Sequence, residues 1–500
     1  MSEAAIALNR FGLGARADES PPADPRNWLT TQIAAYQTTP APIAAAPTSA
    51  KVAADLAAYQ AAQRQIRQTP PPTPGTPPIA TPRMATPLMT APPMAAPPPT
   101  PAAAPQRDAK QLARDTAQHA AQQDYANLVG ARTAVAIATP TPFAERLVWF
   151  WSNHFAVSAD KLELTGLSGT LEMEAIRPHV MGCFADMLFA VERHPAMLLY
   201  LDQAVSVGPD SPVGARAAAR GQRKVGLNEN LAREIMELHT LGVRTGYTQA
   251  DVTEFARAMT GWTVGVIGGG PAARFVADQP PGSFAFVPDI HQPGTRTILG
   301  KTYPAGEEGQ ARAALADFAV HPATARHIAT KLARHFAGDA PPPAMVARLE
   351  TAFRRSNGDL PTVYRALIAS PEAWRPAPAK FKTPWEWTVS SYRALGLADV
   401  KPQAVQGLLN QLGQPVWKPG QPIGYDDTAP SWAGPDAVMR RVEAAERFAA
   451  RSGATIDARA LAPRLFPDAV SPATTQALAR AESPGQALAL LLVSPEMMRR

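Results

Sequence analysis

The strongest constraint on the fold of this chain is a tract between residues 70 and 105 in which fifteen positions are proline. Proline lacks a backbone N–H and fixes φ, so such a tract sustains neither helical nor sheet hydrogen bonding and favours extended conformations. Alanine- and glutamine-rich stretches flank it at about 51–68 and 106–131, and they have strong helix propensity. The sequence therefore predicts a Pro/Ala-rich helical arm over residues 51–131, peripheral to any site, with a disordered tip at 70–105.

Outside this arm, apolar residues recur at helical spacing along most of the chain. We expect a mainly α-helical protein whose multi-helical globular core is built from residues 1–50, 132–262 and 305–500. Between residues 263 and 304, Gly-rich turns alternate with short aromatic or β-branched pieces, which is typical of a small β-hairpin inserted between helices. Residues 132–262 hold most of the candidate site residues.

Composition excludes several classes of protein. Cys183 is the single cysteine, so the chain has no internal disulfide and no cysteine-rich metal site. The net charge is +6, but the arginines are dispersed and form no basic stripe with interleaved aromatics, so we expect no nucleic-acid partner. No run of about 18 apolar residues predicts a transmembrane segment. The N-terminal residues lack the basic and apolar regions of a signal peptide, which favours a cytoplasmic location.

The polar helix predicted over residues 226–242 carries the leading candidate for a reactive group. On a regular helix Glu234 projects from the middle of an apolar stripe, and Asn230 and Glu237 border it. The stripe consists of Leu227, Leu231, Leu238 and Leu241. A carboxylate in a core must be paired, hydrogen-bonded, protonated or bound to a metal. We expect Glu234 to serve as general base or metal ligand, with Asn230 or Arg233 orienting a substrate.

Part of this helix also has a purely structural interpretation. Glu229, Arg233 and Glu237 lie four residues apart, as in an acid–base–acid ladder on a helix surface. His239 lies about 140° around a regular helix from Glu234, so the two bind one ion only if the helix distorts there. His239 and Glu237 are therefore further candidates rather than the leading ones.

His154 is the natural partner of Glu234, because it also falls inside an apolar stripe. That stripe consists of Phe143, Leu147, Phe150 and Trp151. A lone inward histidine is more often a satisfied core residue than a ligand. A metal site would combine His154 and Glu234 with a third ligand from a distant segment, for which His179 and His291 are candidates. Such ligands suit a divalent metal, with zinc, iron and manganese about equally favoured.

Asp202 closes a short predicted helix at its C-terminal end, where the helix dipole disfavours an anion. Asp202 therefore needs a specific partner. A contact with an arginine is favoured over a role in catalysis.

A series of ordered motifs resembles the bacterial domain-of-unknown-function family 1800 over nearly the whole chain outside the Pro-rich insertion. The motifs include Phe150-Trp-Ser-Asn-His-Phe155, His194-Pro-Ala-Met-Leu-Leu-Tyr-Leu-Asp202, Asn228-Glu-Asn-Leu-Ala-Arg-Glu234, Glu237-Leu-His-Thr-Leu-Gly242 and Thr260-Gly-Trp262. Trp262, in the Thr260-Gly-Trp262 motif, is a further candidate site residue. The family is named for its unknown function, so the resemblance implies no particular activity.

The resemblance does imply a partner. Proteins of family 1800 are commonly encoded beside members of family 1501, which look like the sulfatase and alkaline-phosphatase superfamily and often bear twin-arginine export signals. Co-export to the periplasm with such a partner is an alternative to a cytoplasmic location.

Two functional hypotheses follow. In the first, the protein is an enzyme with a hydrolytic or metal-assisted reaction in a buried His154/Glu234 pocket. In the second, it is a non-enzymatic accessory or chaperone-like partner of a family 1501 protein, and its inward polar residues form a structural network.

Overall fold

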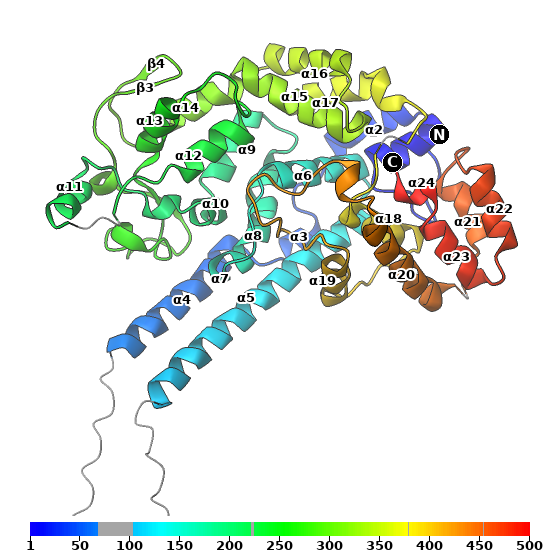
Figure 1. Ribbon diagram of the computed structural model, residues 1–500, viewed down its shortest axis with the longest axis horizontal. Helices are drawn as coiled ribbons and strands as arrows, with labels where there is room; N and C mark the ends of the chain where they lie inside the picture. Colours follow the sequence, from blue (N-terminus) through cyan, green and yellow to red (C-terminus); the bar gives the residue numbers. More distant parts are fainter. Residues whose placement is uncertain (69–103, 222–224, 379, 454) are drawn as a thin grey trace, which may run out of the picture.

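The computed structural model describes residues 1–68, 104–221, 225–378, 380–453 and 455–500. It is 63% helical, which confirms the predicted mainly α-helical class. The helices gather into a broad body from which two long helices project (Figure 1).

The projecting helices are α4 (Ser49–Gln68) and α5 (Ala104–Ala138), which run side by side (Figure 1). Both predicted flanks of the proline tract are thus helical, and α5 continues past the predicted boundary at residue 131. The predicted tip at 70–105 lies outside the described residues up to residue 103. The C-terminal half of α5 is anchored in the body, where Leu128, Val129 and Ala136 are fully buried.

The body is assembled from helices that precede and follow this pair. Before it come α1 (Glu3–Ile6), a π-helical turn (Ala7–Phe11), α2 (Pro25–Ala35) and α3 (Ala41–Ala44). After it come α6 (Pro142–His154), α7 (Leu162–Thr165), α8 (Leu167–Thr170), a π-helical turn (Leu171–Ile176), α9 (Phe184–Glu192), α10 (Pro195–Tyr200), α11 (Pro212–Ala219), α12 (Asn230–Glu234), a π-helical turn (Ile235–His239) and α13 (Gln249–Met259).

The remaining helices follow the strands. They are α14 (Glu308–Val320), α15 (Pro322–Ala337), α16 (Pro343–Arg355), α17 (Leu360–Ala369), α18 (Pro384–Ala394), α19 (Pro402–Gln411), α20 (Pro435–Ser452), α21 (Ala458–Leu465), α22 (Pro472–Arg480), α23 (Pro484–Leu492) and α24 (Pro495–Met498).

Many of the prolines outside the tract begin helices, where a missing N–H costs nothing. Pro195 and Pro322 each occupy the first turn after a histidine cap. His194 Nδ1 accepts a hydrogen bond from the backbone N–H of Ala196, and His321 Nδ1 accepts one from Ala323 in the same way. Proline and cap together fix where α10 and α15 begin.

The strand region contains the predicted small hairpin and a second antiparallel strand pair. β1 (Trp262–Val264) pairs with β2 (Phe284–Phe286) across a long connection. β3 (Arg296–Ile298) and β4 (Lys301–Tyr303) form a tight hairpin. Its two loop residues, Leu299 and Gly300, both have positive φ, as a two-residue turn between twisted strands requires.

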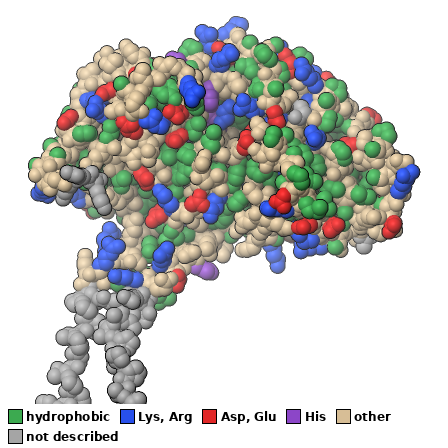
Figure 2. All heavy atoms as spheres, viewed as in Figure 1, with side chains coloured by type: hydrophobic (Ala, Val, Ile, Leu, Met, Phe, Trp, Pro, Cys, Tyr) green, Lys and Arg blue, Asp and Glu red, His purple; other side chains and the backbone are tan. Residues whose placement is uncertain are grey.

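The main hydrophobic core runs from α1 to α17, and a second cluster joins α18 to α20–α24. A third cluster packs α5 against α6, α18 and α19, and it includes Trp149, Trp385 and Trp417. Lys and Arg side chains are interspersed with Asp and Glu over the face shown in Figure 2. Within the described ranges, no helix is long and apolar enough to cross a membrane.

Candidate functional site

The helix carrying Glu234 does not keep the regular geometry assumed from the sequence. α12 ends at Glu234 and the chain continues as a π-helical turn over Ile235–His239. A π turn spaces its hydrogen bonds five residues apart and so rotates the following side chains. As a result Ile235 and Met236 are fully buried, whereas the predicted stripe members Leu227 and Leu238 are only partly buried. Leu231 and Leu241 are buried as predicted, so the predicted stripe is wrong at Leu227 and Leu238.

Glu234 accordingly lies at the edge of the core and not within it. Its side chain is partly buried, and no hydrogen bond or ion pair joins it to His154 in the described chain. Partial burial raises the pKa of its carboxyl group, and the nearby His239 opposes that rise. The predicted Glu234–His154 pair is thus not formed in this structure.

The π turn instead directs His239 inward. Its ring is fully buried, and Nδ1 lies 2.8 Å from Oε1 of Glu192, which is also fully buried. The Nε2 atom of His239 has no hydrogen-bond partner among the described residues. The buried acid–histidine pair of this region is Glu192–His239.

His154 is buried, as predicted, but its partner comes from α15. Its Nδ1 lies 2.9 Å from Nζ of Lys331, and its Nε2 lies 3.1 Å from the carbonyl oxygen of His239. Burial, then the charge of Lys331, places the pKa of His154 well below its usual value. The ring is therefore neutral, with Nε2–H donating to the carbonyl and Nδ1 accepting from the lysine.

Three polar side chains of α15 lie four residues apart and face this region. They are His327, Lys331 and His335. The His327 ring is 6.0 Å from the ring of His154. Burial lowers the pKa of Lys331 to about 8, while the charge of Asp427 raises it. Burial, then the charge of Lys331, lowers the pKa of His327 to about 4.

The remaining predicted residues of the polar helix lie on the surface. Arg233 reaches Glu229 at 3.3 Å and Glu237 at 3.5 Å, so the acid–base–acid ladder is present. The Asn230 side chain is exposed, at the first residue of α12. Asp202 contacts Lys161 at 3.4 Å, so its partner is a lysine and not the expected arginine.

The other candidate ligands serve local structure. His291 places Nδ1 2.7 Å from the carbonyl oxygen of Thr260 and Nε2 2.9 Å from that of Gly306, which ties three loops together. His179 lies in a short 3-10 turn (Arg177–His179) and is partly buried. Trp262 is fully buried in the main core. Among the described residues, no three His, Cys, Asp or Glu side chains are grouped as metal ligands.

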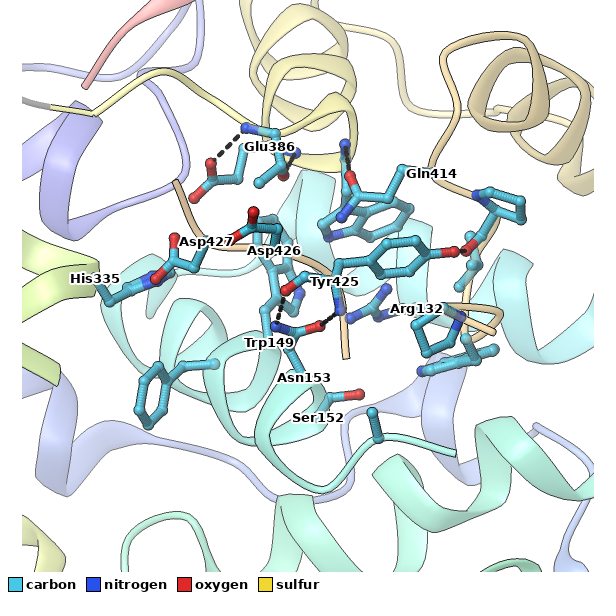
Figure 3. A pocket seen from close by; sticks show the side chains of 18 of the residues that line it. Arg132, Trp149, Ser152, Asn153, His335, Glu386, Gln414, Tyr425, Asp426 and Asp427 are labelled. Carbon is cyan, nitrogen blue, oxygen red and sulfur yellow. Dashed lines mark hydrogen bonds and ion pairs between the residues drawn. The ribbon is translucent and has the colours of Figure 1, made fainter. Parts of the chain in front are cut away.

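The hollow that Lys331 lines is a pocket of about 890 Å³, part of it open to solvent (Figure 3). Its walls come from four regions that are distant in sequence: α5 and α6, α15, the start of α18, and the loop at 414–427. Tryptophans, polar side chains and charged side chains all line it; they include Arg132, Trp149, Asn153, Lys331, His335, Trp385, Glu386, Trp417, Tyr425, Asp426 and Asp427.

One pair of hydrogen bonds holds the loop against α6. The Asn153 amide donates to the carbonyl of Tyr425 at 2.8 Å and accepts from its backbone N–H at 2.8 Å (Figure 3). Gly424 precedes this contact with φ of +82°, and a Cβ there would lie 2.4 Å from the carbonyl oxygen of Asn153. Glycine is therefore required where the loop crosses α6.

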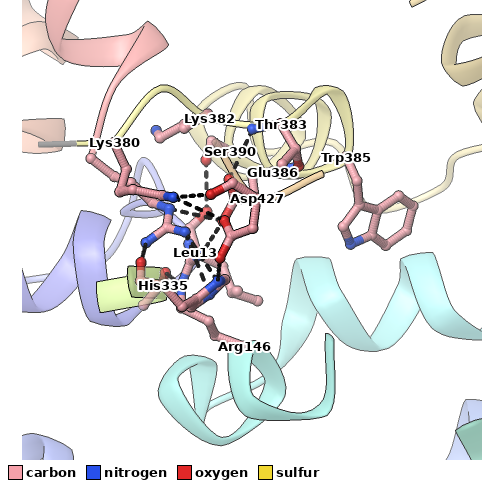
Figure 4. Close-up of polar contacts among 12 residues, drawn as sticks. Leu13, Arg146, His335, Lys380, Lys382, Thr383, Trp385, Glu386, Ser390 and Asp427 are labelled. Atoms are coloured by element: carbon pink, nitrogen blue, oxygen red, sulfur yellow. Dashed lines mark hydrogen bonds and ion pairs between the residues drawn. The ribbon is translucent and has the colours of Figure 1, made fainter. Parts of the chain in front are cut away.

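The base of the pocket is a buried charge network (Figure 4). Asp427 contacts His335 at 3.2 Å and Lys380 at 3.1 Å. Glu386 pairs with Arg146 and lies 2.8 Å from Nε of Arg500. Although burial opposes it, these arginines lower the pKa of Glu386 to about 2.

Glu386 and Asp427 are therefore ionised structural anions that fix the pocket base. Glu386 also caps α18, because its carboxylate accepts the backbone N–H of Thr383 at 2.9 Å. The spacing of Thr383 and Glu386 is the capping-box pattern, which the sequence alone can reveal. Burial lowers the pKa of His335 to about 4, so this ring is neutral near pH 7.

Sequence reasoning missed Lys331, His335 and Asp427. A signal existed for the first two, since a His–Lys–His series at intervals of four residues on one predicted helix defines a polar face. No comparable signal exists for Asp427, which lies in an irregular loop.

The fold and the pocket define a mainly α-helical protein with a polar, tryptophan-lined cavity. The family described as "Protein of unknown function (DUF1800)" matches residues 6–499, and the chain belongs to this family. Neither the curated proteins nor the solved structures compared with the chain contain a match.

Proposed function

We propose that the protein is a hydrolytic enzyme in which Lys331 transfers protons to and from a substrate bound in the pocket. One observation carries this proposal: a lysine amine that lines a cavity is hydrogen-bonded to a buried, neutral histidine, with Lys331 Nζ and His154 Nδ1 2.9 Å apart. This proposal keeps His154 from the sequence-based hypothesis and replaces Glu234 by Lys331.

The electrostatics support a proton-transfer role. A general acid or base works best when its pKa lies near the working pH. An ordinary lysine is far from that condition, but burial lowers the pKa of Lys331 to about 8. His154 accepts one N–H of Lys331 and so orients the amine, while Asp427 stabilises its protonated form.

Lys331 alone can carry out both proton transfers of a hydrolytic cycle. The ammonium form of Lys331 gives a proton to the leaving group as the scissile bond breaks. The resulting amine takes a proton from the water molecule that attacks the substrate. One water is consumed, two products form, and Lys331 returns to its starting state.

The amine itself can be tested before a substrate is known. Competitive labelling with an acylating reagent, followed by mass spectrometry, reports the pH at which each lysine becomes nucleophilic. We expect the labelling midpoint of Lys331 near pH 8, well below the usual lysine value of 10.5. A midpoint of Lys331 at the usual lysine value of 10.5 would refute the proposal.

Activity is the second test. Screening the wild-type protein against ester, phosphoester, sulfoester and glycoside substrates should find turnover that Lys331→Met removes, by roughly 10²–10⁴-fold. Lys161→Met is the matched control and should retain full activity. Full turnover in Lys331→Met would show that another group transfers the proton.

A second proposal is the accessory role beside a family 1501 protein, with co-export as its consequence. The projecting α4–α5 pair favours it, because Leu112 on α5 is 69% exposed beside an apolar groove between the two helices. Co-purification with the neighbouring gene product should weaken in Leu112→Asp. Unchanged co-purification, or none with the wild type, would contradict this role.

A further inference from the structure

Arg132, at the body end of α5, is held with unusual rigidity beside the pocket. Its Nε lies 3.0 Å from Oε1 of Glu172, and its Nη2 lies 3.0 Å from Oε2. Glu172 is fully buried and also accepts the indole N–H of Trp417 at 2.9 Å. A two-point contact of this kind fixes the plane of the guanidinium group.

Three tryptophan rings surround the same group. The guanidinium carbon lies 4.5 Å from the ring centroid of Trp385, 5.2 Å from that of Trp417 and 5.9 Å from that of Trp149. The rings attract the cation and exclude water from it. The pocket therefore presents a guanidinium group that Glu172 fixes in place and that aromatic rings surround.

Several donors at this end of the pocket have no acceptor. Nη1 of Arg132 donates to no group in the described part of the chain. The indole N–H groups of Trp149 and Trp385 are buried without a partner among the described residues, although both residues line the pocket. The indole of Trp417 differs, since Glu172 satisfies it. A buried donor without an acceptor costs about 1–3 kcal/mol, so the two buried indole N–H groups indicate a missing acceptor, and the free Nη1 of Arg132 lies at the same pocket.

The acidic residues of the pocket do not supply that acceptor. Asp427 is engaged by His335 and Lys380. Asp426 accepts hydrogen bonds from Thr428 and Ser431 in its own loop. Neither of these described carboxylates is left to pair with the donors, so we look for the acceptor in a bound molecule.

We propose that Arg132, with the indole N–H groups of Trp149 and Trp385, forms an oxyanion-binding subsite of the pocket. Its ligand is a carboxylate, sulfate or phosphate group carried by the molecule that binds there. Identifying that molecule as a substrate rests on the function proposed for Lys331, but oxyanion binding does not. Arg132 is thus a binding residue that sets the substrate class, and Lys331 lines the same pocket.

Indole N–H resonances offer a direct test. The protein is labelled with ¹⁵N-tryptophan, and acetate, sulfate and phosphate are titrated separately at constant ionic strength. We expect at least one of them to shift the Trp149 and Trp385 resonances saturably. Trp262 is the internal control, because its buried indole N–H also lacks a partner in the described chain but lies outside the pocket. The three titrations distinguish a carboxylate site from a sulfate or phosphate site.

Variants assign the effect to the subsite. Arg132→Lys keeps the charge but loses the fixed fork, and we expect about tenfold weaker binding or more. Trp149→Phe keeps an aromatic ring but replaces the indole and so removes its N–H, and it should weaken binding less. If no oxyanion shifts the two wild-type resonances, or if Trp262 shifts equally, the subsite proposal is overturned regardless of how the variants fold.

The same titration in Lys331→Met separates this inference from the proposed function. If oxyanions still bind to Lys331→Met while the wild-type Lys331 amine labels with the usual lysine midpoint, the subsite proposal stands and the catalytic role of Lys331 is removed. If the labelling midpoint of Lys331 is near pH 8 but no oxyanion binds, the catalytic role of Lys331 stands and the subsite proposal is removed.

Discussion

Two helical segments of this protein carry charged and histidine side chains toward one interior region, and they differ in regularity. α15 remains an α-helix from Pro322 to Ala337, so its polar residues at intervals of four stay on one face. The segment at 230–239 changes from α to π after Glu234. After this change His239 points into the core, whereas Glu234, which precedes the π turn, lies at the edge of the core.

The comparison teaches that residue spacing places side chains reliably only where the helix is regular. In α15 the spacing brings Lys331 to the pocket and to His154. In 230–239 the same rule selects Glu234, although His239 and Glu192 form the buried pair. Sequence reasoning ranks Glu234 above His239, but in the structure the π turn makes His239 the buried residue of this segment.

The largest expected effect is the loss of the buried pair. Glu192→Ala leaves His239 buried without its partner, and breaking a buried pair costs about 3–5 kcal/mol. Urea unfolding at pH 7 should show this loss of stability. A loss below about 1 kcal/mol would mean that His239 is not the inward residue of this segment.

The next largest effect is expected at His327 of α15, on the free energy of unfolding at acidic pH. The pKa of His327 is about 4 in the folded protein, below its usual value of 6.5, so the unfolded chain binds this proton more readily. His327 therefore contributes stability above pH 6.5 that is lost as the pH falls toward 4.

His327→Gln should flatten that part of the stability curve by about 2 kcal/mol, measured by urea unfolding between pH 7 and 4. Parallel curves for the wild type and the variant would show that His327 titrates normally. Glu234→Gln is the comparison variant from the other segment. The raised pKa of Glu234 gives it the opposite sign, with stability that is lost as the pH rises.

Lys331 should produce the next effect, at alkaline pH; its side chain, like that of His327, is only partly buried. Its folded pKa of about 8 lies below the usual 10.5, so the unfolded chain again binds the proton more readily. Lys331 then adds stability as the pH rises from 8 to 10.5.

Lys331→Met lacks this increment. The stability difference between wild type and variant should therefore grow by about 1–2 kcal/mol in favour of the wild type over that range. Unfolding by urea at intervals across it gives the measurement. A constant difference would place the pKa of Lys331 at its ordinary value.

The smallest effect is expected at the residue that the sequence ranked first. Glu234→Gln should change stability at pH 7 by less than about 0.5 kcal/mol, because its side chain is partly exposed and has no ion pair in the described chain. Thermal and urea unfolding test this directly. A loss near that of Glu192→Ala would restore Glu234 to the core.

The helical class could be predicted because apolar periodicity and proline starts act locally. Caps such as His194, His321 and Thr383 are local signals of the same kind. The burial of His154 was predicted for this reason and is confirmed. The identity of its partner was not, because Lys331 lies 177 residues away and no local pattern links the two.

The pocket lay beyond sequence reasoning for the same physical reason. Asn153 meets Tyr425 across 272 positions, through an amide that recognises backbone atoms and not a side chain. Because this contact uses only the backbone of Tyr425, the type of residue at position 425 does not indicate it. The π turns after residues 6, 170 and 234 also lack a distinctive composition, so their effect on side-chain direction appears only in three dimensions.

The walls of the pocket come from segments between residue 132 in α5 and residue 427, at the end of the 414–427 loop. No contiguous half of the chain contains them all. The protein therefore cannot be divided into a catalytic module and a supporting one, and two fragments expressed separately would regain the cavity only by reassociating. An engineered protein that is to contain this cavity must therefore retain most of the chain. In contrast, α4 and the outer part of α5 do not line the cavity and can be exchanged without altering it.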